Sequence, residues 1–199
     1  MKRLIILAPG VATSKVEALT WTAALARRLC GPEDGYATYR PGWIFPPAVR
    51  FAAYRRHYVR GFQRFVADAV LDYRPKVVDC VTHSFGGWMA WRGMQDSGGP
   101  QAVFRRLVLM APPVSSRSDP ASVLGHVDRV ACLHSREDEV IRFSTLGMAG
   151  CIGFAAGATA GSPDANGAVL LNYDLTPLEH GDYTRPGPAW GVAEAFLNG

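Results

Sequence analysis

The most constraining feature of this sequence is a strand-like apolar run that stops abruptly at a serine between small residues. Residues 77–81 (Val-Val-Asp-Cys-Val) favour a buried strand, and residues 88–94 (Trp-Met-Ala-Trp-Arg-Gly-Met) favour a helix. Between them, residues 82–87 (Thr-His-Ser-Phe-Gly-Gly) allow only a sharp turn. Such a strand–turn–helix unit holds Ser84 at the edge of a sheet, with its hydroxyl exposed beside the backbone N–H groups of the helix.

The rest of the chain alternates between short apolar runs and helical patterns. The predicted strands are residues 4–8, 36–39, 77–81, 106–111, 129–134 and 169–173. Strands that are apolar throughout and separated by helices indicate a parallel sheet that is covered on both faces. We therefore predict one α/β domain over residues 1–199, with a doubly wound, mostly parallel sheet of about six strands and helices on both faces.

A long amphipathic helix is expected after a proline-bounded loop at residues 41–47. Its apolar face steps by three or four residues: Phe51, Tyr54, Tyr58, Phe62, Phe65 and Ala69. Most of the arginines in this region fall off that face, which is typical of a solvated helix surface. Residues 43–45 (Trp-Ile-Phe) are candidates for the border of a pocket, and the Gly/Ala-rich segment 147–161 receives no assigned role.

Composition narrows the class of protein. Of the 199 residues, 48% are hydrophobic and 19% are charged, which is ordinary for a soluble globular chain. No apolar run approaches the roughly 18–20 residues that a membrane span needs. Residues 4–8 are too short for the apolar core of a signal peptide, so we expect a cytoplasmic location. The four cysteines show no C-x-x-C spacing, which predicts free thiols rather than a metal or redox site.

A serine hydroxyl is a weak nucleophile unless a histidine removes its proton and a carboxylate orients that histidine. In doubly wound sheets the working residues lie beyond the carboxyl ends of the strands. Asp138 follows the fifth predicted strand and His180 follows the sixth. We therefore predict Ser84 as nucleophile, His180 as base and Asp138 as acid.

Other acidic and histidine residues lie close to these positions. Glu137 and Glu139 flank Asp138 and have the chemistry to play the same orienting role. Asp182 lies too near His180 in the sequence to reach the far side of its ring, so we expect it to shape the loop. His83, directly before the nucleophile, is expected to be a packed or hydrogen-bonded wall residue.

Four motifs in this order resemble those of the α/β-hydrolase superfamily. Residues 82–87 resemble the lipase and esterase elbow, and residues 138–141 (Asp-Glu-Val-Ile) resemble the acid loop. Residues 180–183 (His-Gly-Asp-Tyr) resemble the terminal histidine loop, and residues 8–11 (Ala-Pro-Gly-Val) resemble the oxyanion loop. The chain is similar to a small esterase- or lipase-like member that lacks a large cap domain and the family's opening antiparallel strands.

The resemblance implies acyl transfer from a carboxylic ester, with the backbone N–H groups of Val11 and Phe85 forming the oxyanion hole. Two motifs depart from the family pattern: residues 8–11 lack the histidine of the His-Gly oxyanion loop, and Thr82 stands where the elbow has glycine. A β-branched residue is expected to strain this crowded position more than glycine would.

The same fold and triad serve several reactions, so alternatives stay open. The leading prediction is a metal-free esterase without a cofactor, acting on a small or medium ester. Thioesterase, amidase and acyltransferase chemistry are alternatives, and a non-catalytic binding protein is a third reading that the arginine-rich helix supports. We expect a small-molecule partner, no nucleic acid and no membrane span, while the sequence leaves oligomeric state and substrate identity open.

Overall fold

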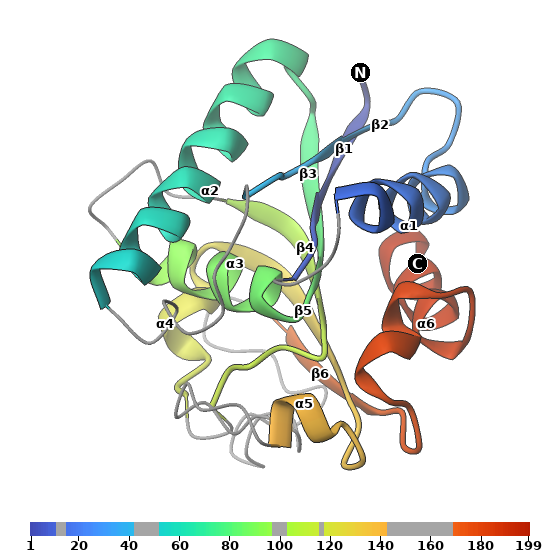
Figure 1. Ribbon diagram of the computed structural model, residues 1–199. Coiled ribbons are helices and arrows are strands. Elements are labelled where there is room, and N and C mark those ends of the chain that lie inside the picture. The colour runs from blue at the N-terminus through green and yellow to red at the C-terminus, as the bar shows by residue number, and fades with distance from the viewer. Residues whose placement is uncertain (11–14, 42–51, 97–102, 116–117, 143–168) are drawn as a thin grey trace.

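The computed structural model describes residues 1–10, 15–41, 52–96, 103–115, 118–142 and 169–199, which form a central sheet flanked by helices (Figure 1). The strands are β1 (Arg3–Ala8), β2 (Gly35–Thr38), β3 (Val77–His83), β4 (Phe104–Met110), β5 (Val127–His134) and β6 (Val169–Asp174). The helices are α1 (Lys15–Leu29), α2 (Ala52–Tyr73), α3 (Phe85–Gln95), α4 (Ala121–Leu124), α5 (Glu139–Arg142), the 3-10 helix η2 (His180–Thr184) and α6 (Pro188–Asn198).

All neighbouring strands in the sheet run parallel, in the order β2-β1-β3-β4-β5-β6. Parallel neighbours need crossover connections, which helices usually provide. Figure 1 shows α2, α3 and α4 over one face of the sheet and α1 and α6 over the other. The predicted doubly wound α/β sheet is confirmed.

The sheet separates two apolar cores, which explains why its strands are apolar throughout. Along β1, Leu4 and Ile6 pack into the core beneath α2 and α3. Ile5 and Leu7, on the opposite face, pack into the core beneath α1 and α6. Because both faces of the strand are buried, no alternation of polar and apolar residues appears in the sequence.

Two strands begin well before the predicted residues, whereas β1 and β2 begin one residue early. β4 and β5 each start two residues before the expected bounds, because Phe104 and Val127 pair across the two strands. The short helices α4 and α5 were not predicted. The Gly/Ala-rich segment 147–161 and residues 43–45 lie outside the described residues.

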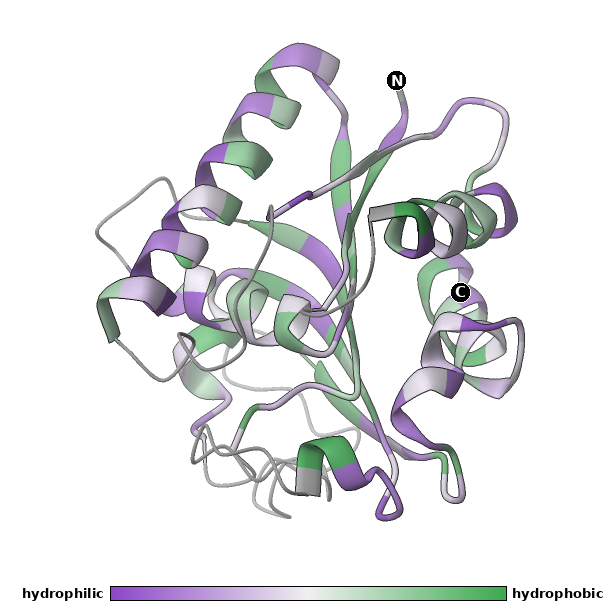
Figure 2. Ribbon diagram, viewed as in Figure 1, coloured by the Kyte–Doolittle hydropathy of each residue, from purple (hydrophilic) through white to green (hydrophobic). Residues whose placement is uncertain are grey.

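Helix α2 buries the face that its pattern predicted and turns Arg60 and Arg64 outward. Tyr58, Phe62 and Ala69 are buried, whereas Arg60 and Arg64 are exposed. Figure 2 shows hydrophilic colour along the outer side of α2. This face is therefore solvated, as predicted.

A buried glutamine fixes α2 against α3. Gln63 is 1% exposed, and its Nε2 donates hydrogen bonds to the carbonyl oxygens of Gly93 (2.8 Å) and Asp96 (3.0 Å). A side chain on Gly93 would meet Gln63 at 3.4 Å, so the glycine allows this close approach. The spacing of the two helices is set at the C-terminal end of α3.

Cys30, Cys80 and Cys132 are free thiols, and Cys151 lies outside the described residues. Burial raises the pKa of the Cys132 thiol to about 12 and also raises that of Cys80, so both stay protonated and unreactive. Within the described ranges, no helix combines the length and the apolar character that crossing a membrane requires.

Candidate active site

Ser84 lies at the sharp turn between β3 and α3. Its backbone angles are φ 54° and ψ −128°, a region that residues other than glycine rarely adopt. The turn is held from both sides, since Ser84 N–H donates to the carbonyl oxygen of Met110 (2.9 Å) and Gly87 N–H donates to that of Ser84 (2.8 Å). The surrounding hydrogen bonds therefore maintain a strained backbone at the serine.

The segment after β1 packs directly against this turn. A Cβ on Gly86 would overlap the carbonyl oxygen of Ala8 and would lie 2.9 Å from that of Pro9. A Cβ on Gly10 would lie 2.7 Å from Ser84 Cβ and 3.1 Å from its Oγ. Glycine is required at both positions because backbone and serine approach so closely.

Thr82 is accommodated rather than strained, which corrects the expectation drawn from the sequence. Its side chain is fully buried, and its hydroxyl donates to the carbonyl oxygen of Val108 on β4 (3.0 Å). Room for it comes from Gly87, where a Cβ would lie 3.1 Å from Thr82 Oγ1. The buried hydroxyl is thus paired, and the glycine that the elbow needs is on the other side of the turn.

Ser84, His180 and Asp138 form one chain of hydrogen bonds at the carboxyl ends of β3, β5 and β6. Ser84 Oγ lies 2.9 Å from His180 Nε2, and His180 Nδ1 lies 2.9 Å from Asp138 Oδ2. A carboxylate can only accept, so Nδ1 carries the proton and Nε2 is free to accept from the serine. Asp138 is 1% exposed, and its other oxygen accepts from the N–H of Ile141 (3.0 Å).

The neighbouring acids take other roles. Glu137 and Glu139 are exposed, so the carboxylate beside His180 belongs to Asp138. Asp182 caps η2, because its Oδ2 accepts from the N–H of Glu179 (2.9 Å). The structure thus gives Asp182 the loop-shaping contact that its position predicts.

His83 forms a wall behind His180. Its Nε2 donates to the carbonyl oxygen of His180 (3.1 Å), and the two ring centroids lie 4.7 Å apart. Trp21 and Tyr183 enclose the ring from two other sides. Burial, with a smaller effect from His180, lowers the pKa of His83 to about 3, so this imidazole is neutral near pH 7.

Phe85 and Val11 are the residues predicted to supply oxyanion donors. Phe85 is the first residue of α3, and its backbone N–H is among those that have no partner within a helix. Its ring is buried and stacks on Trp88 with centroids 5.2 Å apart. Val11 lies outside the described residues, although Gly10 directly before it touches Ser84.

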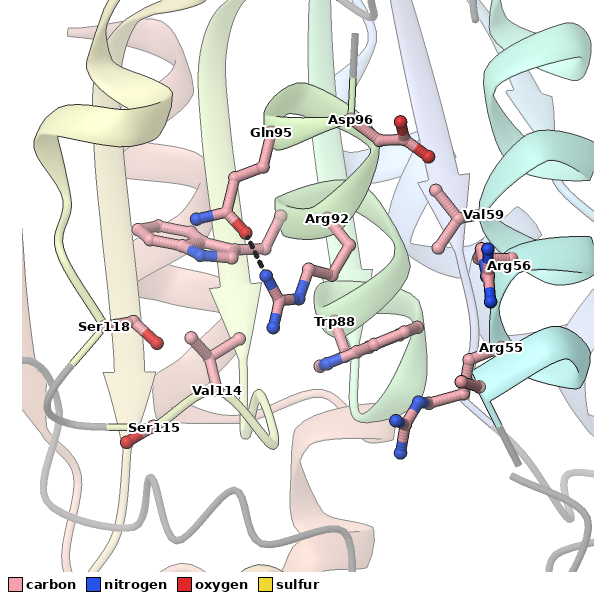
Figure 3. A pocket seen from close by; sticks show the side chains of 12 residues that line it. Arg55, Arg56, Val59, Trp88, Arg92, Gln95, Asp96, Val114, Ser115 and Ser118 are labelled. Atoms are coloured by element: carbon pink, nitrogen blue, oxygen red, sulfur yellow. Dashed lines mark hydrogen bonds between the residues drawn. The ribbon is translucent and has the colours of Figure 1, made fainter. Parts of the chain in front are cut away.

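A cavity of about 490 Å³ lies along α3, between α2 and the segment that follows β4 (Figure 3). It is lined by Ala52, Arg55, Arg56, Val59, Trp88, Trp91, Arg92, Gln95, Asp96, Val114, Ser115 and Ser118. Sequence reasoning did not identify these residues as a site. One signal was present: Trp88 and Arg92 follow Ser84 at steps of four, which places them along one side of α3.

No group of three or more metal-ligating side chains is gathered in the part of the chain that the structure describes. The candidate site consists of the hydrogen-bonded Ser84, His180 and Asp138, residues 9–10 beside the serine, and the cavity along α3.

Neither a protein-family model nor a curated protein matches this chain. Several solved structures are similar to it. The match to lipase B from Aspergillus fumigatus (TM-score 0.67, 13% identity) covers 100% of this chain but only 52% of the lipase. A hydrolase from Oleispira antarctica (TM-score 0.59, 9% identity) is matched over 100% of this chain and 92% of its own. The match to an acetyl xylan esterase (TM-score 0.54, 11% identity) covers 98% of this chain and 96% of the esterase.

Proposed function

We propose that this chain, which has the α/β-hydrolase fold, is a serine hydrolase that cleaves carboxylic esters of small or medium acyl substrates. The observation that carries the proposal is the continuous chain of hydrogen bonds from Ser84 Oγ through His180 to the buried Asp138. Three side chains from three different loops meet at hydrogen-bond distance, beside a strained backbone and a helix N-terminus. This is the arrangement that activates a serine hydroxyl.

The first half of the reaction follows from the hydrogen bonds. As Ser84 Oγ attacks the ester carbonyl, its proton passes to His180 Nε2, and the ring becomes an imidazolium. Asp138 stabilises that charge through Nδ1 and keeps the ring oriented. The carbonyl oxygen becomes an oxyanion, for which the N–H groups of Phe85 and Val11 are the proposed donors.

The second half restores the enzyme. His180 gives its proton to the departing alcohol as the tetrahedral intermediate collapses to an acyl-serine. A water then loses a proton to His180 and attacks the acyl group, and the same proton returns to Ser84 Oγ as the acid leaves. The cycle thus consumes one water and one ester and returns Ser84 and His180 to their starting protonation states.

The similar structures add support at the level of chemistry. They include a lipase and an acetyl xylan esterase, names that denote ester cleavage. This chain spans about half of the lipase, so the lipase's own substrate does not transfer to it. The proposal therefore specifies an ester bond but no particular acyl group.

The test is turnover of p-nitrophenyl acetate and butyrate by the wild type, by Ser84→Ala and by Thr20→Ala. Thr20 is an exposed hydroxyl residue on α1 and serves as the matched control. We expect Ser84→Ala to lose about 10⁴-fold or more in kcat, as triad serines do, and the control to match the wild type. Equal rates for Ser84→Ala and the wild type would refute the role of Ser84.

A second measurement separates ester hydrolysis from its alternatives. A panel of esters, acyl-CoA thioesters and amides should show the largest kcat/KM on esters, and a dominant thioester rate would replace the proposal. A fluorophosphonate probe should label folded wild-type protein at Ser84. Folded protein that neither labels nor turns over any member of the panel would instead be a binding protein.

A further inference from the structure

The cavity along α3 carries a concentration of positive charge. Three arginines line it, Arg55, Arg56 and Arg92, against one acid among its lining residues, Asp96. Its formal charge is therefore three minus one, or +2, which is half of the chain's net charge of +4. Like charges gathered around one hollow repel each other, and an anion bound there would relieve that repulsion.

Two of these arginines form no ion pair with an acid in the part of the chain that the structure describes. Arg56 makes no ion pair with any described residue, and Arg92 bonds to the neutral amide oxygen of Gln95 at 2.9 Å. They come from opposite walls, Arg56 from α2 and Arg92 from α3 (Figure 3). A carboxylate or phosphate between the walls would receive charge-assisted hydrogen bonds from both sides.

The cavity also has an apolar part beside the polar side chains of Gln95, Ser115 and Ser118. Val59, Trp88 and Val114 line the cavity, and the guanidinium carbon of Arg55 lies 5.9 Å from the centroid of the Trp88 ring. A cation held over an aromatic face is attracted to it, which keeps Arg55 beside the ring. The cavity thus joins an apolar surface to a cationic rim, a combination suited to a chain that ends in an anion.

The position of the cavity relates it to Ser84. Trp88 and Arg92 lie four and eight residues after the serine, which corresponds to about 6 Å and about 12 Å along the helix. Figure 3 shows Trp88, nearer the start of α3, below Arg92, while Gln95 and Asp96 lie at the far end. A ligand chain that begins at Ser84 would meet the aromatic wall first and the arginines next.

We propose that this cavity is a binding subsite for an anionic group of the substrate, so that the natural ester carries a carboxylate or phosphate about 6–12 Å from the bond that is cleaved. The inference rests on the proposed function, because it names the substrate class of the same serine. The chemistry required is a chain with an apolar middle and an anionic end.

The first test compares mono-p-nitrophenyl esters of dicarboxylic acids with their neutral ω-carboxamides. The wild type should prefer the suberate ester over its carboxamide by about tenfold in kcat/KM, and should prefer the succinate ester less because its carboxylate does not reach Arg92. In Arg56→Gln/Arg92→Gln the suberate preference should fall about tenfold, in line with the loss of charge-assisted bonds. No preference in the wild type, or the same preference in the double variant, would overturn the proposal.

The matched control is Arg27→Gln/Arg74→Gln. Both residues are exposed, the first on α1 and the second just after α2, and the pair removes the same charge as the test variant without touching the cavity. We expect the control to keep the wild-type preference. A loss in the control as large as in Arg56→Gln/Arg92→Gln would assign the effect to overall charge and overturn the subsite.

Binding measured without turnover keeps this inference separate from the proposed function. In Ser84→Ala, calorimetry should detect suberate binding, and tryptophan fluorescence should change because Trp88 lines the cavity. Both signals should disappear when Arg56→Gln/Arg92→Gln is combined with Ser84→Ala. If esters are not cleaved and the serine is not labelled but this binding holds, the proposed function fails while the anion site stands. If suberate binding does not depend on Arg56 and Arg92, the proposed anion site is refuted.

A second source of an anionic group for this cavity is the headgroup of a membrane lipid. Sedimentation with vesicles of phosphatidylglycerol, compared with phosphatidylcholine, tests that source. We expect no arginine-dependent sedimentation, because the proposal concerns the substrate's own group. Arginine-dependent binding to phosphatidylglycerol with no preference among dissolved esters would overturn it in favour of lipid headgroups.

Discussion

His83 should make the folded protein sensitive to mild acid. Its ring is 5% exposed and lies between Trp21, Tyr183 and His180, and the charge of Asp138 acts on it. The perturbation is His83→Gln, because the glutamine Nε2 can still donate to the carbonyl oxygen of His180 but does not titrate in this range.

The magnitude follows from the two pKa values. Burial lowers the pKa of His83 to about 3 in the folded protein, against about 6.5 in an unfolded chain. Between these values the unfolded chain binds a proton that the folded protein does not, so the free energy of unfolding falls as pH falls. The limiting slope is about 1.4 kcal/mol per pH unit, and between pH 7 and pH 5 the loss due to His83 is about 2 kcal/mol.

The assay is urea unfolding of the wild type, His83→Gln and His57→Gln at pH 7 and pH 5. Other groups titrate in all three proteins, so the quantity to compare is the change in unfolding free energy between the two pH values. The loss of unfolding free energy from pH 7 to pH 5 should be about 2 kcal/mol smaller in His83→Gln than in the wild type. In His57→Gln, which replaces an exposed histidine on α2, this loss should equal that of the wild type. An equal change in all three proteins would refute the buried, neutral state of His83.

Three further substitutions test the candidate site. Asp138→Asn should lower kcat by about 10³–10⁴-fold on p-nitrophenyl butyrate, because His180 loses its charged partner, and a loss under tenfold would contradict the orienting role. Gly86→Ala should destabilise the protein by about 3 kcal/mol in urea, since its Cβ overlaps a carbonyl oxygen of β1. Gly191→Ala on α6, where a Cβ meets nothing within 4 Å, should not destabilise it. Thr82→Val should cost about 1 kcal/mol, because the carbonyl oxygen of Val108 loses its donor, and an unchanged urea midpoint would show that this hydrogen bond contributes nothing.

The sheet was predictable because its strands are buried on both faces. A run such as residues 4–8 has no polar position, and that pattern admits few arrangements other than a central parallel strand. Helices α4 and α5 were not predictable in the same way. Four residues do not complete enough turns to show a helical period, so their formation depends on contacts that the sequence does not display.

The candidate site was likewise predictable from the sequence only in part. The order of Ser84, Asp138 and His180 after three strands predicts that they meet, because parallel strands end at one edge of the sheet; their catalytic roles stay a prediction. The fit of Thr82 could not be read from the sequence. It depends on the carbonyl oxygen of Val108 on β4, which comes from a distant part of the chain, and on how the turn folds Gly87 back beside Thr82.

The cavity shows why substrate recognition is harder to predict than the nucleophile. One wall follows from local periodicity, since Ser84, Trp88 and Arg92 are spaced by four residues along α3. The other wall is set by how closely α2 approaches, and that distance depends on the buried amide of Gln63 reaching the carbonyl oxygens at the end of α3. A glutamine within an arginine-rich helix gives no sign that it will be buried. The same arginine stripe that is a solvated surface over most of α2 therefore becomes a charged wall only where α3 faces it, and this contact forms the cavity that we propose as the subsite for the substrate's anionic group.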